Sequence, residues 1–131
     1  MEIEKAFPSL NLCMELPEGY FPDSAFVHVE RFRNGFCLDC QLEVMSRERA
    51  ECEDDYRILC PAPTLAEIVE KMPKSFEATV TCIYHLGQWE VEYYHKLEGV
   101  RKTSYDNDNP AEAALKVLLE LIHEEDRDKE V

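Results

Sequence analysis

The sequence is poor in basic residues, in glycine and in long apolar runs. Its 131 residues contain 14 Lys and Arg against 28 Asp and Glu, which gives a formal net charge of −14. This imbalance disfavours binding to the phosphate backbone of a nucleic acid or to an anionic membrane. It is compatible with a basic protein partner and, as the more common case, with carboxylates that only keep the surface solvated.

No apolar run approaches the roughly 18 residues that a membrane-spanning helix needs. The first residues, Met1-Glu2-Ile3-Glu4-Lys5, lack the basic start and apolar centre of a signal peptide. We therefore expect a cytoplasmic protein that does not bind membranes. With 45% apolar residues, the chain is expected to form one domain over 1–131, with loose ends at 1–5 and 124–131.

The scarcity of glycine excludes a glycine-rich phosphate-binding loop, and no H-E-x-x-H motif or nucleophile elbow occurs. The four glycines are all expected in turns or loops: Gly19, Gly35, Gly87 and Gly99.

The four histidines fall in four different predicted elements: His28, His85, His95 and His123. A hairpin turn at Gly87 places His85 near Trp89 and not near His95. The histidines therefore predict no acid–base pair and no metal site. We expect no cofactor and no enzymatic activity.

Six cysteines in a chain expected in the cytosol are interpreted as reduced thiols. Cys37 and Cys40 have the C-x-x-C spacing of zinc ligands, with two more cysteines downstream. In the strand predicted over 35–45, however, these two side chains point to opposite faces and cannot bind one metal ion. The sequence thus predicts no structural zinc, and Cys40 and Cys82 are interpreted as small core residues.

The clearest predicted element is a helix over 110–123. Asn109 is a capping residue, Pro110 suits the first helical position, and Glu112 is placed to bond back to the cap. Apolar residues then recur at helical spacing, with polar residues on the other side. The apolar stripe comprises Ala111, Ala114, Leu115, Val117, Leu118, Leu121 and Ile122. A stripe this broad predicts packing against the face of a sheet.

Three runs before this helix, over 76–84, 89–97 and 100–104, alternate apolar and polar residues as half-buried strands do. Tight turns separate them, which predicts an antiparallel meander. In the first run the residues expected to face the core are Phe76, Ala78, Val80, Cys82 and Tyr84. A capping box from Thr64 to Glu67 opens a further helix upstream, which Pro73 ends.

The first half of the chain has a similar order. A short helix is predicted from Ser9 to Leu16, followed by a hairpin over 25–45 that turns at Asn34-Gly35. Segment 46–55 is charged throughout and is predicted as an exposed loop or a marginal helical turn, before a short strand over 56–60. The fold class is therefore α+β, with an antiparallel sheet and two helix–hairpin units. The shared order is compatible with a worn duplication of one helix–hairpin unit and equally with chance agreement.

The helix–three strands–helix order of 63–122 is also that of double-stranded-RNA-binding domains, which carry lysines at the start of the last helix. This chain carries carboxylates there, so direct nucleic-acid binding is not expected. The inverse hypothesis is that carboxylates imitate a nucleic-acid backbone and block a basic protein. The candidate interaction residues are Glu48, Glu51, Glu53, Asp54, Asp55, Asp106 and Asp108.

A set of short motifs spans most of the chain. They are Phe7–Leu10 with Leu12-Cys13, Gly19 with Phe21-Pro22, Ala62–Glu67 with Met72-Pro73, and Asn109–Ala114 with Leu118–Ile122. Together they resemble small uncharacterised proteins carried by bacteriophages and prophages, especially those of gut Bacteroidetes. These motifs are helix caps and core positions, so the resemblance implies a phage or mobile element and a bacterial cytosol, and no chemistry.

The function expected from the sequence is that of a small non-enzymatic accessory protein that binds a protein partner. The alternative is an acidic inhibitor that occupies the nucleic-acid-binding surface of a basic host protein. The sequence leaves the identity of the partner and the oligomeric state open.

Overall fold

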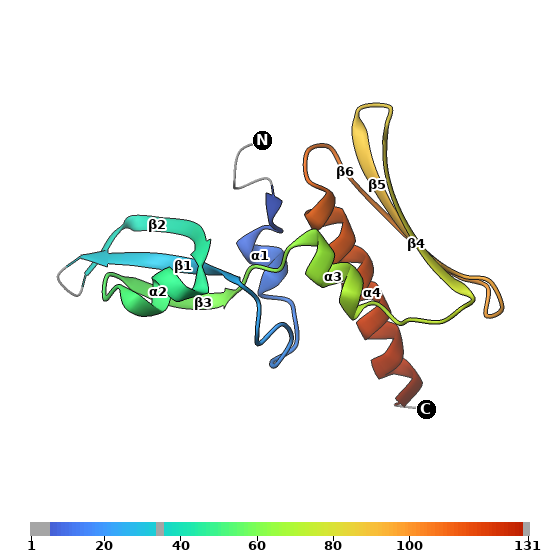
Figure 1. The fold of residues 1–131 in the computed structure, drawn as a ribbon, viewed down its shortest axis with the longest axis horizontal. Helices are drawn as coiled ribbons and strands as arrows, with labels where there is room; N and C mark the ends of the chain where they lie inside the picture. Colours follow the sequence, from blue (N-terminus) through green and yellow to red (C-terminus); the bar gives the residue numbers. More distant parts are fainter. Residues whose placement is uncertain (1–5, 34–35, 130–131) are drawn as a thin grey trace.

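The computed structural model describes residues 6–33 and 36–129 and shows an α+β fold with two three-stranded antiparallel sheets, one from each half of the chain (Figure 1). In chain order the elements are α1 (Leu10–Cys13), β1 (Phe26–Arg33), β2 (Phe36–Ser46), α2 (Arg47–Cys52), β3 (Tyr56–Pro61), α3 (Leu65–Lys71), β4 (Ala78–His85), β5 (Gln88–His95), β6 (Val100–Asp106) and α4 (Pro110–Lys129). The predicted α+β class and both predicted helix–hairpin units are confirmed. The antiparallel sheet expected from the sequence is present as two separate three-stranded sheets.

The N-terminal sheet has the strand order β2-β1-β3, so the third strand joins β1 and not β2. β1 and β2 form the predicted hairpin, whose last pair is Arg33 with Phe36. The turn residues Asn34 and Gly35 lie outside the described residues. A small core of its own lies beneath this sheet, formed by Val27, Val29, Met45 and Ala50 with Tyr56 against them.

The charged segment after β2 is a helix and not a loop. The hydroxyl of Ser46 caps α2 by accepting a bond from the amide of Arg49, and Ala50 is buried against the N-terminal sheet. The cap and one buried small residue are enough to fix this turn in a segment with little apolar periodicity. Of the two alternatives that the sequence left for 46–55, the helical turn is therefore correct.

The C-terminal sheet is the predicted meander, with the order β4-β5-β6. Its strands pair without a register shift, from Ala78 with His95 to His85 with Gln88. The turn between them is two residues long, and both have positive φ, 53° for Leu86 and 78° for Gly87. Positive φ at both positions is the geometry that matches the twist of a two-residue hairpin.

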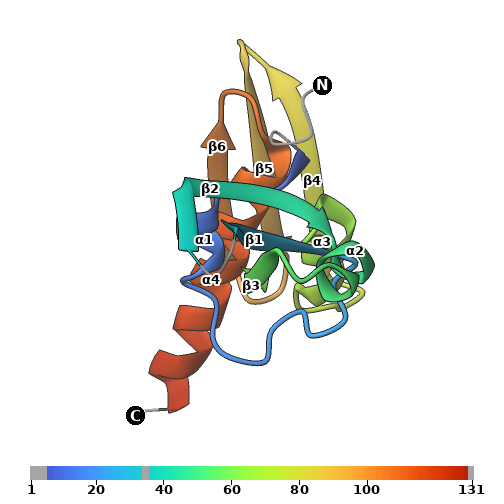
Figure 2. The same cartoon turned by 90° about the vertical axis from the view of Figure 1, so that its left-hand side faces the viewer.

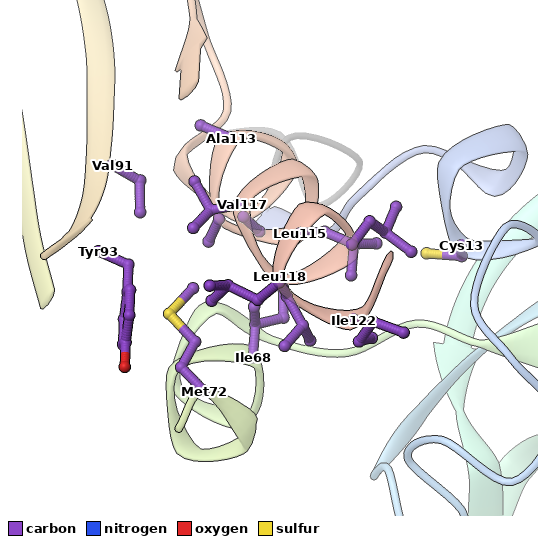
Figure 3. Close-up of a cluster of buried hydrophobic side chains, with 14 of the residues drawn as sticks. Cys13, Ile68, Met72, Val91, Tyr93, Ala113, Leu115, Val117, Leu118 and Ile122 are labelled. Atoms are coloured by element: carbon purple, nitrogen blue, oxygen red, sulfur yellow. The ribbon is translucent and has the colours of Figure 1, made fainter. Parts of the chain in front are cut away.

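Helix α4 is the centre of the molecule. It lies between the two sheets and packs against β5 and β6 on one side, and against α3 and α1 on others (Figures 1 and 3). The whole predicted apolar stripe of α4 is buried. Ala113 and Leu119 are buried as well, because the helix is covered from more than one direction. None of the described helices is long and apolar enough to cross a membrane.

The prediction that residues 124–131 form a loose end is wrong for 124–129, because α4 continues to Lys129. Glu124 forms an ion pair with Lys102 of β6, which ties this part of the helix to the sheet. Residues 130 and 131, and the predicted loose end at 1–5, lie outside the described residues. α1 is shorter than predicted and ends at Cys13.

At the start of α4, Asn109 caps the helix as predicted, but Glu112 makes a different contact from the one predicted. Asn109 accepts a bond from the amide of Glu112 and donates one to the carbonyl of Phe7 at 2.7 Å. The carboxylate of Glu112, expected to bond back to the cap, instead accepts bonds from the amide and the hydroxyl of Ser9. This carboxylate therefore joins the first turn of α4 to the cap of α1, a contact between residues that are far apart in sequence.

Candidate functional site

The candidate acidic residues divide into two separate groups. Glu48 and Glu51 lie on α2, and Glu53, Asp54 and Asp55 follow it before β3. The second group comprises Asp106 at the end of β6 and Asp108 before α4. The two groups lie on different parts of the molecule in both views (Figures 1 and 2).

The acidic group around α2 also contains positive charge. Arg49 pairs with Glu53, with 3.5 Å between Nε and Oε2, and Arg57 pairs with Glu30. A phosphate backbone carries continuous negative charge, whereas this group contains both signs of charge and lies apart from Asp106 and Asp108. The acidic residues are therefore a poor match to a nucleic acid. The inhibitor hypothesis stays a prediction, resting on the group around α2 alone.

The cysteines of the described part are free thiols: Cys13, Cys52, Cys60 and Cys82. Burial raises the pKa of Cys13 strongly and that of Cys60 to about 11, so neither thiol is activated as a nucleophile. β2 contains both Cys37 and Cys40, whose side chains lie outside what the structure describes. The prediction about zinc therefore stays a prediction. No three metal-binding side chains come together among those that the structure does describe.

A pocket of about 480 Å³ lies between the α1 segment and β3. Its lining is largely apolar, with Leu16, Tyr20 and Ile58 among its walls, and Glu18 and Arg47 at its margin. Arg47 is held by a bond from its Nε to the carbonyl of Ser24 at 2.8 Å. The two cysteines in this pocket, Cys13 and Cys60, are the thiols whose pKa is raised by burial, so neither supplies an activated nucleophile.

The expectation that no histidine forms an acid–base pair is wrong for His85. Its Nε2 lies 2.9 Å from a carboxylate oxygen of Glu90, and the hydroxyl of Tyr105 donates to the other oxygen at 3.3 Å. The three residues come from β4, β5 and β6, and the chief cause of a raised Tyr105 pKa is the charge of Glu90. His85 and Tyr105 are exposed, where water screens such a network and gives it little catalytic strength.

His28 is the buried histidine of the described part, and its ring Nε2 donates to the carbonyl of Pro8 at 3.0 Å. Burial lowers its pKa, although the Pro8 carbonyl and the nearby carboxylate of Glu112 oppose that shift. The unfolded chain, with an ordinary histidine pKa of about 6.5, then binds more protons than the folded chain below that pH. The contribution of His28 to stability is thus complete above about pH 6.5 and is lost as the pH falls toward the folded pKa.

We therefore expect the free energy of unfolding to fall as the pH is lowered below about 6.5. Replacing His28 by Gln, which keeps a donor and does not titrate, should flatten this dependence. Urea unfolding at a series of pH values measures it. His123→Gln, at an exposed position of α4, is the control for exchanging a histidine for a glutamine elsewhere in the chain. Equal slopes for the wild type and His28→Gln would contradict the assignment.

The prediction that the apolar residues of the run over 76–84 face the core is wrong for three of the five residues. Ala78 and Val80 are half-buried, but Phe76, Cys82 and Tyr84 are exposed. The reason is position, because β4 is an edge strand and α4 covers β5 and β6. The interpretation of Cys82 as a core residue is wrong for the same reason.

The end of the β4–β5 hairpin extends past the helices in both views (Figures 1 and 2). Three large apolar side chains are exposed there, Ile83, Tyr84 and Leu86, which we call the hairpin tip. Sequence reasoning missed this surface. A signal for it was present, since Ala78–His85 contains no Asp, Glu, Lys or Arg in a chain that is 32% charged.

Comparison of the chain with protein-family models, with curated protein sequences and with solved structures finds no match.

Proposed function

We propose that the chain is a small non-enzymatic protein that acts by binding other proteins through the hairpin tip. The observation that carries this proposal is the exposure of Ile83, Tyr84 and Leu86 together at the end of one hairpin. Exposed apolar side chains gathered in one place are typical of a protein–protein contact, whereas isolated ones are common on any surface.

The turn itself supports this role. Leu86 is 92% exposed, so its side chain adds nothing to the core, and its φ of 53° is unfavourable for a residue with a branched side chain. Asn or Gly at this position would form the same turn with less strain. A leucine that stabilises neither the core nor the turn is suited to contact with a partner.

The same proposal places the protein in a bacterial cytosol, as an accessory protein of a phage or another mobile element. The support for this setting is that the cap and core motifs resemble those of small phage and prophage proteins. The strongly acidic surface keeps such a protein soluble and disfavours contact with nucleic acid.

Replacing Leu86 by Asn should stabilise the fold and weaken binding. Asn tolerates positive φ, and relief of strain at this position should raise the free energy of unfolding by about 1 kcal/mol. Urea unfolding measures this change. The matched control is Leu97→Asn, since Leu97 is also exposed but lacks a positive φ, and this variant should gain no stability. A loss of stability in Leu86→Asn would show that the leucine serves the turn.

The binding arm of the experiment uses the full chain as bait in a bacterial lysate. Proteins that the wild type and Leu97→Asn retain, and that Leu86→Asn and Ile83→Thr release, support the proposed function. Identical sets of retained proteins for all four baits would contradict it, because the hairpin tip would then make no contribution.

A further inference from the structure

We infer that two copies of the chain pair through β4, antiparallel and edge to edge, so that their two three-stranded sheets become one continuous sheet. This inference rests on the proposed function, because it takes the β4–β5 hairpin as an interaction surface and names a second copy of the chain as a partner. Addition of a strand to an exposed sheet edge is a recurring mode of protein recognition.

The backbone of β4 offers a row of free hydrogen-bonding groups. The amide of Lys96 donates to the carbonyl of Glu77 at 2.9 Å, so odd-numbered residues bond to β5. The backbone groups of the even-numbered residues Val80, Cys82 and Tyr84 therefore point away from β5, toward the open edge. The register with β5 contains no bulge from Ala78 to His85, which leaves this edge regular enough to receive another strand.

The two edges of this sheet differ in their protection. Soluble proteins normally guard a sheet edge with charged residues, proline or a bulge. The β6 edge carries Arg101, Lys102 and Asp106. The β4 edge carries no Asp, Glu, Lys, Arg or proline over its eight residues. β4 is therefore the edge that the sequence leaves open to pairing.

Two chains of net charge −14 repel each other across most of their surfaces, but two copies can meet along β4 without that repulsion because the strand carries no Asp or Glu. An antiparallel β4–β4 pair centred on Cys82 sets no two carboxylates opposite each other, since even the flanking Glu77 falls opposite Gly87 of the other copy. A basic strand from another protein would find no carboxylate on β4 to bind.

The apolar residues beside β4 match in the same register. Phe76, before the strand, is fully exposed, and Leu86, after it, is 92% exposed. With Cys82 opposite its own copy, Leu86 falls opposite Ala78 and diagonal to Phe76, within reach of a large side chain. Val80 falls opposite Tyr84 on both sides of the two-fold axis. One contact thus covers the exposed residues at both ends of the strand, as a self-complementary interface requires.

The mass of the full chain in solution tests this inference. Sedimentation equilibrium over a range of micromolar concentrations should give a species of twice 15.3 kDa. Cys82→Lys sets two like charges opposite each other at the two-fold axis, and should raise the dissociation constant of the dimer about tenfold or more. The matched control is Cys52→Lys, at an exposed cysteine of α2, which should leave the dimer intact. Both substitutions reduce the net negative charge equally, so loss of the dimer in only one cannot come from overall charge.

Tyr84→Lys is a second variant for the same edge, and circular dichroism with thermal unfolding checks that each variant is folded. Cysteine cross-linking gives an independent readout, because opposed residues of an antiparallel pair have Cα atoms about 5.5 Å apart, within disulfide range. Oxidation should give a covalent dimer with the wild type and Cys52→Ser, and none with Cys82→Ser.

A wild type that remains monomeric would overturn the inference, and so would a dimer that Cys82→Lys and Tyr84→Lys leave unchanged. The proposed function would survive either result if Leu86→Asn still released proteins from the lysate. A dimer that depends on β4, combined with baits that all retain the same proteins, would instead support the pairing of two copies and contradict the wider proposal.

Discussion

Truncating Leu118 to Ala should lower the free energy of unfolding by about 2–5 kcal/mol, the range for removal of a buried leucine side chain. Leu118 is 2% exposed and lies at the centre of the main core. Figure 3 shows its side chain among those of Ile68 of α3 and Met72, the residue after α3, with β5 on one side and α1 on the other. Elements from both halves of the chain therefore meet around this one helix. The cavity left by truncation of Leu118 would be bounded by several of these elements, which cannot all shift to fill it.

The control for Leu118 is two residues away on the same helix. Lys116 is exposed, so Lys116→Ala should change the free energy of unfolding by only a few tenths of a kcal/mol. Urea unfolding followed by circular dichroism measures both variants. Similar losses at the two positions would contradict the assignment of the buried face of α4.

The parts of the fold that could be predicted are those that local chemistry specifies. The Thr64–Glu67 capping box forms with both of its bonds, at 3.0 and 3.2 Å. The apolar stripe of α4 is buried as its spacing predicts, because 3.6-residue periodicity fixes which residues share a face. The meander follows from its short turns, since strands joined by so few residues pair with their neighbours in sequence.

The parts that could not be predicted depend on where an element lies in space. The alternation in β4 shows which residues share a face, but whether a helix covers that face is decided by strand order. For the same reason the sequence did not reveal that Glu112 bonds to Ser9, or that His85 meets Glu90 across the hairpin.

The candidate site illustrates the same limit. The acidic residues could be named from composition, but their division between α2 and the start of α4 depends on two sheets that fold apart from each other. The uncharged stretch of β4 could also be seen in the sequence. Its meaning required the edge position, because the same run in a central strand would be ordinary core.

Truncating Met45 to Ala should also cost about 2–5 kcal/mol, but mainly within the N-terminal sheet. Met45 is 6% exposed and packs in the small cluster with Val27, Val29 and Ala50, which is separate from the main core around α4. In a cluster of so few residues, one truncated side chain removes a large share of the apolar contacts. Proteins open locally in cooperative units that correspond to such clusters. We therefore expect the loss to appear as opening of β1, β2 and β3 while α4 stays folded.

Native-state hydrogen exchange distinguishes this local opening from global unfolding. In Met45→Ala, amides of β1 and β3 should exchange faster than in the wild type, while the buried amides of α4 keep their protection. Leu42→Ala is the matched control, since Leu42 lies on the same strand and is half-exposed, and it should change exchange little. Equal acceleration in α4 and β1 would mean that the two cores unfold as one unit. The coupling would then have to pass through contacts that join the two cores, such as the bond from His28 of β1 to the Pro8 carbonyl beside α1, whose Cys13 belongs to the main core.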